Sequence, residues 1–221
     1  MFILHAFLNL LFPPRCVGCG SMARWLCLDC DRSWRQQLDT RVTVYPDLPL
    51  PIFIAAKDYS DYLSKLLFAW KYQRYLQASE TLQSLWSAAF VHTFGTTQAI
   101  TLVPVPIHWF KYWQRGFNQA EQLSQLAVQS FAVEQKLLLS RRHYTATQVG
   151  LTKTQRQENL VAAFEVDNQI AATIPKENLI VLVDDIVTSG TTLLQCQQVL
   201  HQAGFHHIVA LVLHRGTRSA L

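Results

Sequence analysis

The stretch Ile180-Val-Leu-Val-Asp184-Asp185-Ile-Val-Thr188-Ser189-Gly190-Thr191-Thr192 decides the fold. The segment Leu179–Asp184 is apolar up to its final residue, as in a strand that is buried on both faces of a parallel sheet. A short loop rich in hydroxyl groups follows, and residues 191–203 then show the spacing of a helix. A buried strand that leads through a loop into a helix is the repeating unit of an α/β fold.

The loop after this strand has the composition of an anion site. Its residues are small, and Gly190 precedes a helix whose first N–H groups and dipole attract negative charge. Asp184 and Asp185 stand at the carboxyl end of the strand, where α/β proteins bind ligands and where carboxylates suit a diol or a divalent cation. A ribose 5-phosphate matches both halves of the pattern. The Gly-Lys-Ser/Thr and Gly-x-Gly-x-x-Gly phosphate motifs are absent from the sequence.

The same alternation of elements continues on both sides of this stretch. Apolar strands and helices with one apolar face follow each other along the chain. Strands are predicted at 52–56, 100–105, 136–139 and 208–213, and helices at 63–70, at 78–92 and from about residue 118. The predicted fold class is therefore α/β, with a parallel sheet covered by helices on both faces.

Composition excludes several classes of protein. Of the 221 residues, 50% are hydrophobic and 15% are charged, which excludes a disordered chain. No apolar run reaches the roughly 18 residues of a membrane span. Residues 1–12 read as an apolar helix, but no Lys or Arg precedes Arg15, so we expect a cytoplasmic protein rather than a secreted one. This helix is expected to dock on the protein's own body; the alternative is peripheral contact with a membrane surface.

Four cysteines form two C-x-x-C pairs separated by seven residues: Cys16, Cys19, Cys27 and Cys30. Two such pairs supply the four thiolates of a structural, tetrahedral zinc site. Disulfides are the less fitting alternative because there is no secretory signal, and a redox motif would use one pair after a strand. We therefore predict two units: an N-terminal helix with a four-cysteine zinc module over residues 1–45, and an α/β domain over residues 46–221. Cys196, in the predicted last helix, is expected to be a core residue.

Positive charge gathers in the middle of the chain. Residues 101–160 carry seven Lys or Arg against three Asp or Glu, which equals the whole net charge of +4. Such a block is typical of a site for phosphate, pyrophosphate or nucleic acid, or else of a solvated basic face. Within it, His108–Arg115 interleaves aromatic and cationic residues in the manner of a platform for single-stranded nucleic acid. The competing interpretation, favoured on sequence alone, packs these aromatic rings under the sheet.

The segment 180–192 resembles the signature for 5-phosphoribosyl 1-diphosphate (PRPP) in type I phosphoribosyltransferases. Further motifs lie along the rest of the chain: the paired C-x-x-C motifs, Lys71-Tyr72, Pro104-Val-Pro106, Arg115-Gly-Phe-Asn118-Gln119-Ala120, and Gln148-Val-Gly-Leu151 with Arg156 and Asn159. By these motifs the chain is similar, over about residues 10–215, to the ComF family of phosphoribosyltransferase-like proteins, which is linked to natural competence and to the use of DNA as a nutrient.

The resemblance implies a set of site residues. Asp184 and Asp185 would hold the ribose hydroxyls of Mg-PRPP, and the loop near Pro104–Pro106 would approach its pyrophosphate. Residues 141–160 would close over the site, and their basic members, Arg141, Arg142, Lys153 and Arg156, would neutralise the leaving group. The implied catalytic residues are Asp184, Asp185 and Arg156; the implied PRPP-binding residues are Thr188, Ser189, Gly190, Thr191, Thr192, Lys71 and Arg115.

Two functions follow from this resemblance. The protein binds PRPP and serves DNA uptake or use, with single-stranded DNA and the competence machinery as partners; or it is an active phosphoribosyltransferase of nucleotide metabolism whose acceptor no motif marks. A PRPP amidotransferase is excluded because residue 2 is Phe rather than a cysteine nucleophile. A PRPP-sensing repressor would need a helix-turn-helix, and the N-terminal module carries cysteine pairs instead.

Overall fold

The computed structural model describes ten segments of the chain: residues 15–16, 18–22, 26–37, 43–45, 50–56, 61–73, 76–95, 99–131, 133–141 and 163–216. The helix predicted over residues 1–12 lies outside the described residues. So do most of the predicted closing loop at 141–160 and its basic residues Arg142, Lys153 and Arg156.

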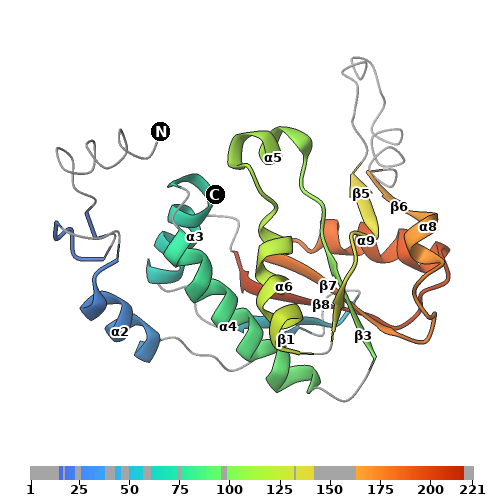
Figure 1. The fold of residues 1–221 in the computed structure, drawn as a ribbon, viewed down its shortest axis with the longest axis horizontal. Helices are drawn as coiled ribbons and strands as arrows, with labels where there is room; N and C mark the ends of the chain where they lie inside the picture. Colours follow the sequence, from blue (N-terminus) through green and yellow to red (C-terminus); the bar gives the residue numbers. More distant parts are fainter. Residues whose placement is uncertain are drawn as a thin grey trace.

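One sheet forms the centre of the molecule (Figure 1). Its strands lie in the order β1-β2-β8-β7-β3-β4, and every pair is parallel except the edge pair β1 and β2. The strands span Thr43–Tyr45 (β1), Ile52–Ala56 (β2), Ile100–Pro104 (β3), Glu134–Gln135 (β4), Leu179–Val187 (β7) and Ile208–Arg215 (β8). The strand that carries the acid pair, β7, therefore lies between β8 and β3 in the middle of the sheet.

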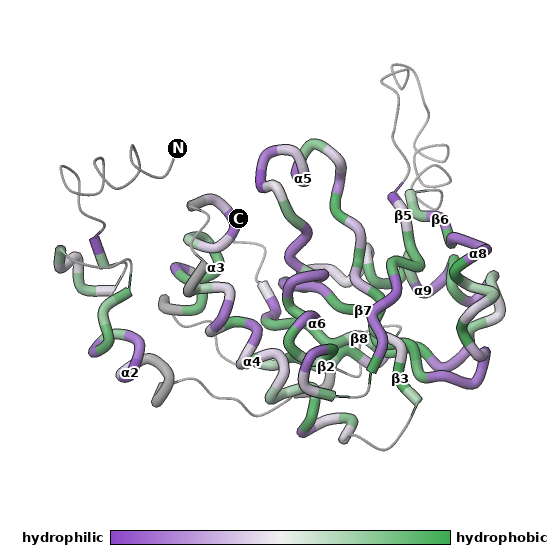
Figure 2. Tube along the Cα trace, in the orientation of Figure 1, coloured by the Kyte–Doolittle hydropathy of each residue, from purple (hydrophilic) through white to green (hydrophobic). Residues whose placement is uncertain are grey.

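Helices cover both faces of this sheet. The residues of β7 alternate: Val181 and Val183 belong to one hydrophobic cluster, and Ile180 and Leu182 belong to the other. The first cluster contains residues of α3 (Asp61–Gln73), α4 (Leu76–Phe94) and α6 (Gln119–Ser130), and the second contains residues of α9 (Thr191–Gln202) and α8 (Asn168–Ala171). The hydrophobic colouring of the central strands follows from this burial on both sides (Figure 2). The predicted α/β fold class is confirmed.

The cysteine segment contributes to the first of these clusters. Cys16 and Leu26 are buried in it together with Leu63 and Leu66 of α3, and Cys27 and Cys30 pack against its edge. Helix α2 (Leu28–Gln37) follows directly. Cys196 in α9 is fully buried in the second cluster, which confirms its expected place in the core.

Two local predictions were wrong. The strand expected over residues 136–139 is instead two strands, because β4 ends at Gln135 and β5 (Leu139–Arg141) leaves the main sheet to pair with β6 (Phe164–Val166). Residues 109–115 form a short helix, α5 (Trp109–Arg115), which carries no buried residue, so its aromatic rings do not pack under the sheet. Seven residues make only about two helical turns, which are too few for a sequence to reveal a helical period.

Candidate functional site

The acid pair lies at the end of β7, as its position in the sequence predicts. Asp185 is 9% exposed, and its Oδ2 pairs with Nζ of Lys71 at 2.6 Å. Lys71 comes from the last turn of α3, more than a hundred residues earlier in the chain. The backbone N–H of Asp185 donates to Oδ1 of Asp184 at 2.8 Å. The Asp185 carboxylate is thus paired with a cation, and the Asp184 carboxylate accepts a backbone N–H.

A cavity of about 180 Å³ opens beside this pair. Most of the charged residues that the resemblance selects line it, and they come from four separate elements, α3, α5, β5 and β7. The lining includes Lys71, Arg115, Asp184, Asp185 and Thr192 of the predicted PRPP site, together with Arg141, His108, Lys111, Asn118, Gln119 and residues 105–107. The fold thus brings together residues up to about 120 positions apart in the sequence.

The loop between β7 and α9 has the conformation that its glycine permits. Gly190 has a φ of 73°, in the left-handed region, and occupies the N-cap position of α9. Because glycine has no side chain, this cap offers no internal acceptor to the first amides of the helix. The hydroxyls of Ser189 and Thr191 are exposed and lie 2.9 Å apart. The N-terminal end of α9 and these hydroxyls therefore present hydrogen-bond donors to solvent close to the acid pair.

The Arg-Gly-Phe-Asn-Gln motif forms the joint between α5 and α6. Gly116 ends α5 with a φ of 83°, and Asn118 caps α6 by accepting the N–H of Ala120 at 3.1 Å. The amide of Asn118 also donates to the carbonyl of Val105 at 3.1 Å, which ties the joint to the segment after β3. The motif therefore fixes the last turn of α5, where Arg115 stands, against the cavity.

Burial raises the pKa of Asp184 to about 7, and repulsion from Asp185 acts in the same direction. The N–H of Asp185 and the charge of Lys71 oppose the increase. Since an unfolded aspartate titrates near 4, the folded state binds more protons than the unfolded state between about pH 4 and pH 7. The contribution of Asp184 to the free energy of unfolding is therefore fully present below about pH 4 and is lost as the pH rises towards 7.

Asp184→Asn should remove this pH dependence. The free energy of unfolding of the wild type should fall, relative to that of the variant, by about 1–3 kcal/mol between pH 5 and pH 7.5. Urea unfolding at both pH values measures the difference, and Asp167→Asn, at the exposed cap of α8, serves as a control that should track the wild type. Parallel curves for wild type and Asp184→Asn would show that Asp184 titrates normally.

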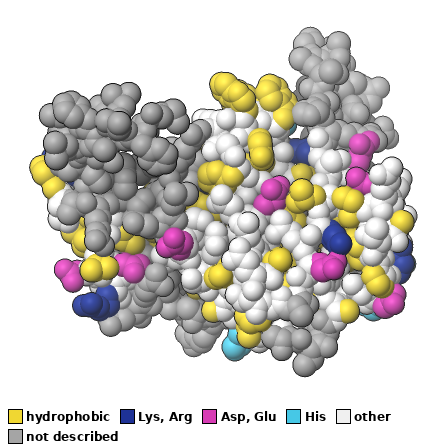
Figure 3. All heavy atoms as spheres, viewed as in Figure 1, with side chains coloured by type: hydrophobic (Ala, Val, Ile, Leu, Met, Phe, Trp, Pro, Cys, Tyr) yellow, Lys and Arg dark blue, Asp and Glu magenta, His cyan; other side chains and the backbone are white. Residues whose placement is uncertain are grey.

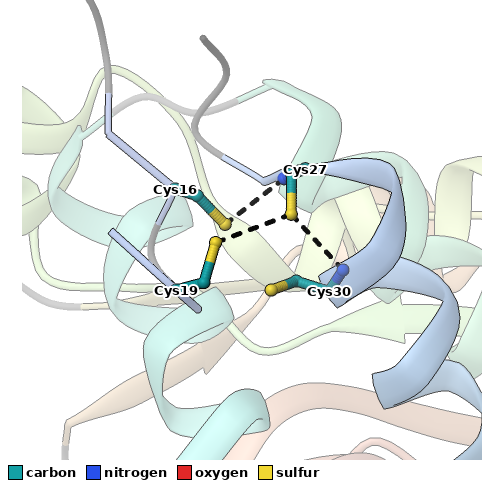
Figure 4. A group of neighbouring side chains, drawn as sticks. All are labelled: Cys16, Cys19, Cys27 and Cys30. Atoms are coloured by element: carbon teal, nitrogen blue, oxygen red, sulfur yellow. Dashed lines mark hydrogen bonds between the residues drawn. The ribbon is translucent and has the colours of Figure 1, made fainter. Parts of the chain in front are cut away.

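The four N-terminal cysteines form a single cluster (Figure 4). Their sulfur atoms all lie within 4.8 Å of one another, and Sγ of Cys19 and Sγ of Cys27 are 3.8 Å apart. Backbone N–H groups point at two of the sulfurs: those of Gly18 and Cys27 donate to Cys16, and that of Cys30 donates to Cys27. Such donors stabilise thiolates, which is the form that binds a metal. Four sulfurs in this arrangement can hold one tetrahedral ion, which matches the predicted module.

The aromatic residues of α5 are exposed. Trp109, Phe110 and Tyr112 are each about half exposed, and Trp113 is 76% exposed. Hydrophobic side chains accordingly gather over α5 at the top of the molecule (Figure 3). The platform interpretation of this segment is therefore compatible with the structure, whereas the buried-cluster interpretation is not.

The described helices include none that is long and apolar enough to cross a membrane. Among the described residues, the cysteine cluster is the only group of three or more His, Cys, Asp or Glu side chains arranged to hold a metal ion.

Comparisons with known proteins give several relatives. Competence protein F of Haemophilus influenzae is 28% identical over 201 residues, which cover 88% of this chain and 82% of that protein. DNA utilization protein YhgH of Escherichia coli is 28% identical over 193 residues, 86% and 78% of the two chains. Competence protein ComFC of Streptococcus pneumoniae is 33% identical over 102 residues, 46% and 42% of the two chains.

No family model matches the chain. A solved structure, described as that of the allosteric regulatory enzyme of purine biosynthesis, aligns with 61% of this chain and 26% of its own at 14% identity. Its TM-score of 0.42 is too low for the alignment to carry an argument.

The parallel sheet, with an acid pair and a hydroxyl-rich loop at the carboxyl end of a central strand, defines an α/β protein whose candidate site lies where this class binds ligands. Its four clustered cysteines lie ahead of that sheet. Its similarity to competence and DNA utilization proteins, along most of both chains, supports a ComF family protein.

Proposed function

We propose that this protein binds PRPP with Mg²⁺ in the cavity at the end of β7. The observation that carries the proposal is the meeting, in one cavity, of the acid pair, the start of α9 and four cationic side chains. Asp184 and Asp185 would hold the ribose hydroxyls or the ion, since carboxylates accept from a diol and also suit a hard cation. Residues 188–192 would hold the 5-phosphate through N–H and hydroxyl donors.

The charges around the cavity fit a ligand of this kind. Among the described residues, four cations and two carboxylates line the cavity, so this part of the lining has an excess of positive charge: Lys71, Lys111, Arg115 and Arg141 against Asp184 and Asp185. Lys71 is paired with Asp185 at 2.6 Å, and a ribose or ion that takes over this carboxylate releases the ammonium group for a phosphate oxygen. The ligand thereby exchanges one ion pair for another instead of leaving a buried charge alone.

Titration calorimetry tests PRPP binding directly. We expect a 1:1 complex with Mg-PRPP and weaker binding of ribose 5-phosphate, which lacks the diphosphate. Binding of inorganic phosphate alone, with no preference for PRPP, would contradict the proposal.

Transfer to an acceptor is a second step that would break the bond between C1 of the ribose and the diphosphate and join C1 to the acceptor. Pyrophosphate release, screened over nucleobases and nucleic acids, would show whether the protein is an enzyme of this kind and identify the acceptor.

Single-stranded DNA is the second proposed ligand, and the exposed rings of α5 favour it. The relatives are named for competence or for DNA utilization, which supports a DNA context for this chain. Helix α5 carries Lys111 between two pairs of exposed aromatic residues. Bases stack on such rings, and the cation attracts the phosphate backbone. We further propose a cytoplasmic location, two units that meet near residue 45, and a zinc ion in the cysteine cluster.

Trp113→Ala should weaken binding of a labelled oligonucleotide by about fivefold or more, because base stacking on an aromatic ring contributes about 1–3 kcal/mol. At 76% exposure this side chain is not part of the hydrophobic core. Lys111→Ala should instead flatten the salt dependence of binding. Leu137→Ala, which removes an exposed apolar side chain outside α5, is the control for fluorescence anisotropy at several salt concentrations. Equal affinities for Trp113→Ala and wild type would remove α5 from the interface.

A further inference from the structure

Three buried N–H groups beside the cavity lack a hydrogen-bond partner within the described part of the chain. They belong to the Nε of Arg115, the Nε2 of Gln119 and the Nε of Arg141. All three residues line the same cavity although they come from α5, α6 and β5. Buried donors are nearly always paired in folded proteins, so three orphaned donors around one cavity point to a ligand that supplies the acceptors.

The orientation of the Gln119 amide follows from its partner. Gln119 is 2% exposed, and its Oε1 accepts from Nη1 of Arg115 at 3.0 Å. A guanidinium group only donates, so the amide must turn its oxygen towards Arg115. The NH₂ group then faces away from Arg115 with donors to offer, and no described residue accepts from it.

The two guanidinium groups are held in place by aromatic rings rather than by carboxylates. Arg115 lies 5.4 Å from the ring centroid of Tyr72 and donates from Nη2 to its hydroxyl at 3.4 Å. Arg141 lies 5.4 Å from the ring centroid of Phe164. Among the described residues neither arginine forms an ion pair. Their positive charges are therefore positioned without a paired carboxylate in the part of the chain that the structure describes.

We infer that Arg115, Gln119 and Arg141 form a subsite for a diphosphate group. The inference rests on the proposed function, since the group would be the diphosphate of PRPP and, after transfer, free pyrophosphate. Two guanidinium groups match the paired oxygens of phosphates, and the neutral amide beside Arg115 adds donors without adding charge. Gln119 would thus have two roles: its oxygen positions Arg115, and its NH₂ group binds a phosphate oxygen.

The variant Gln119→Glu separates these two roles. A carboxylate still accepts from Arg115, so the position of that guanidinium is kept. It has no donor for the ligand and repels it, so the affinity for pyrophosphate should fall about tenfold or more. Arg141→Gln should weaken pyrophosphate binding to a similar degree. Lys136→Gln also removes one positive charge, but Lys136 pairs with Glu134 outside the cavity lining, and this control should bind as the wild type does.

Calorimetric titrations of the full-length protein with pyrophosphate and with ribose 5-phosphate give the outcomes. A selective loss of pyrophosphate affinity in Gln119→Glu and Arg141→Gln, with ribose 5-phosphate binding kept, supports the subsite. Unchanged pyrophosphate affinity in both variants overturns it and leaves PRPP binding standing. A wild type that binds pyrophosphate but not ribose 5-phosphate would instead contradict the proposed function and keep the anion subsite. If Gln119→Glu does not fold by circular dichroism, Arg141→Gln decides by the same comparison.

Discussion

Changing Asp184 and Asp185 together to asparagine is expected to weaken Mg-PRPP binding by about 100-fold or more. Each carboxylate would make charge-assisted hydrogen bonds worth about 1.5–3 kcal/mol, and asparagine keeps the shape while removing the charge. The same variant should retain pyrophosphate binding, because it leaves Lys71 without its 2.6 Å partner and so raises the positive charge of the cavity.

Titration calorimetry with both ligands checks this pair of effects. Asp167→Asn removes a carboxylate at the exposed cap of α8, outside the cavity lining, and should leave both affinities unchanged. Wild-type affinity for Mg-PRPP in the double variant would show that the acid pair does not contact the ligand. Equal losses for PRPP and pyrophosphate would indicate a collapsed cavity instead, and thermal unfolding would detect it.

The second large effect concerns the cysteine cluster. Protein purified without chelators is expected to contain about one zinc ion per chain, because four sulfurs within 4.8 Å of one another complete one tetrahedral shell. Cys27→Ser should reduce the zinc content to less than about a tenth of this value and lower the melting temperature, since structural zinc contributes directly to folding.

Elemental analysis and thermal unfolding, with and without a chelator, measure both results. Cys196→Ala is the matched control, since it removes a buried thiol that belongs to the core of α9 rather than to the cluster, and its zinc content should equal that of the wild type. A zinc-free wild type after anaerobic purification would argue against a metal in this module.

The parts of the molecule that the sequence predicts well are those with local causes. The order of β7, its loop and α9 follows from an apolar run, two acids, a glycine and a helical period within about twenty residues. The cysteine cluster follows from spacing alone, because each C-x-x-C pair turns two sulfurs towards one point.

Gln119 shows what sequence reasoning missed. A glutamine at the start of a helix is usually solvated, and the local sequence gives no sign that the fold buries this one to 2% exposure. Its one sequence signal is its place after Asn118 in the motif that carries the family resemblance. The same resemblance predicts Arg115 and Lys71 as site residues, but only the fold reveals that Lys71 pairs with Asp185.

Helix α3 links two distant parts of the molecule. Near its start, Leu63 and Leu66 pack in one cluster with Cys16 and Leu26, and its last turn carries Lys71 into the cavity. A metal ion that orders the cysteine segment would therefore also steady the helix that supplies this ammonium group. Coupling of this kind is reciprocal, so an anion bound by Lys71 would tighten the hold on the metal by the same factor. Loss of zinc would then lower the affinity for an anion bound at Lys71, although the two ligands do not touch each other.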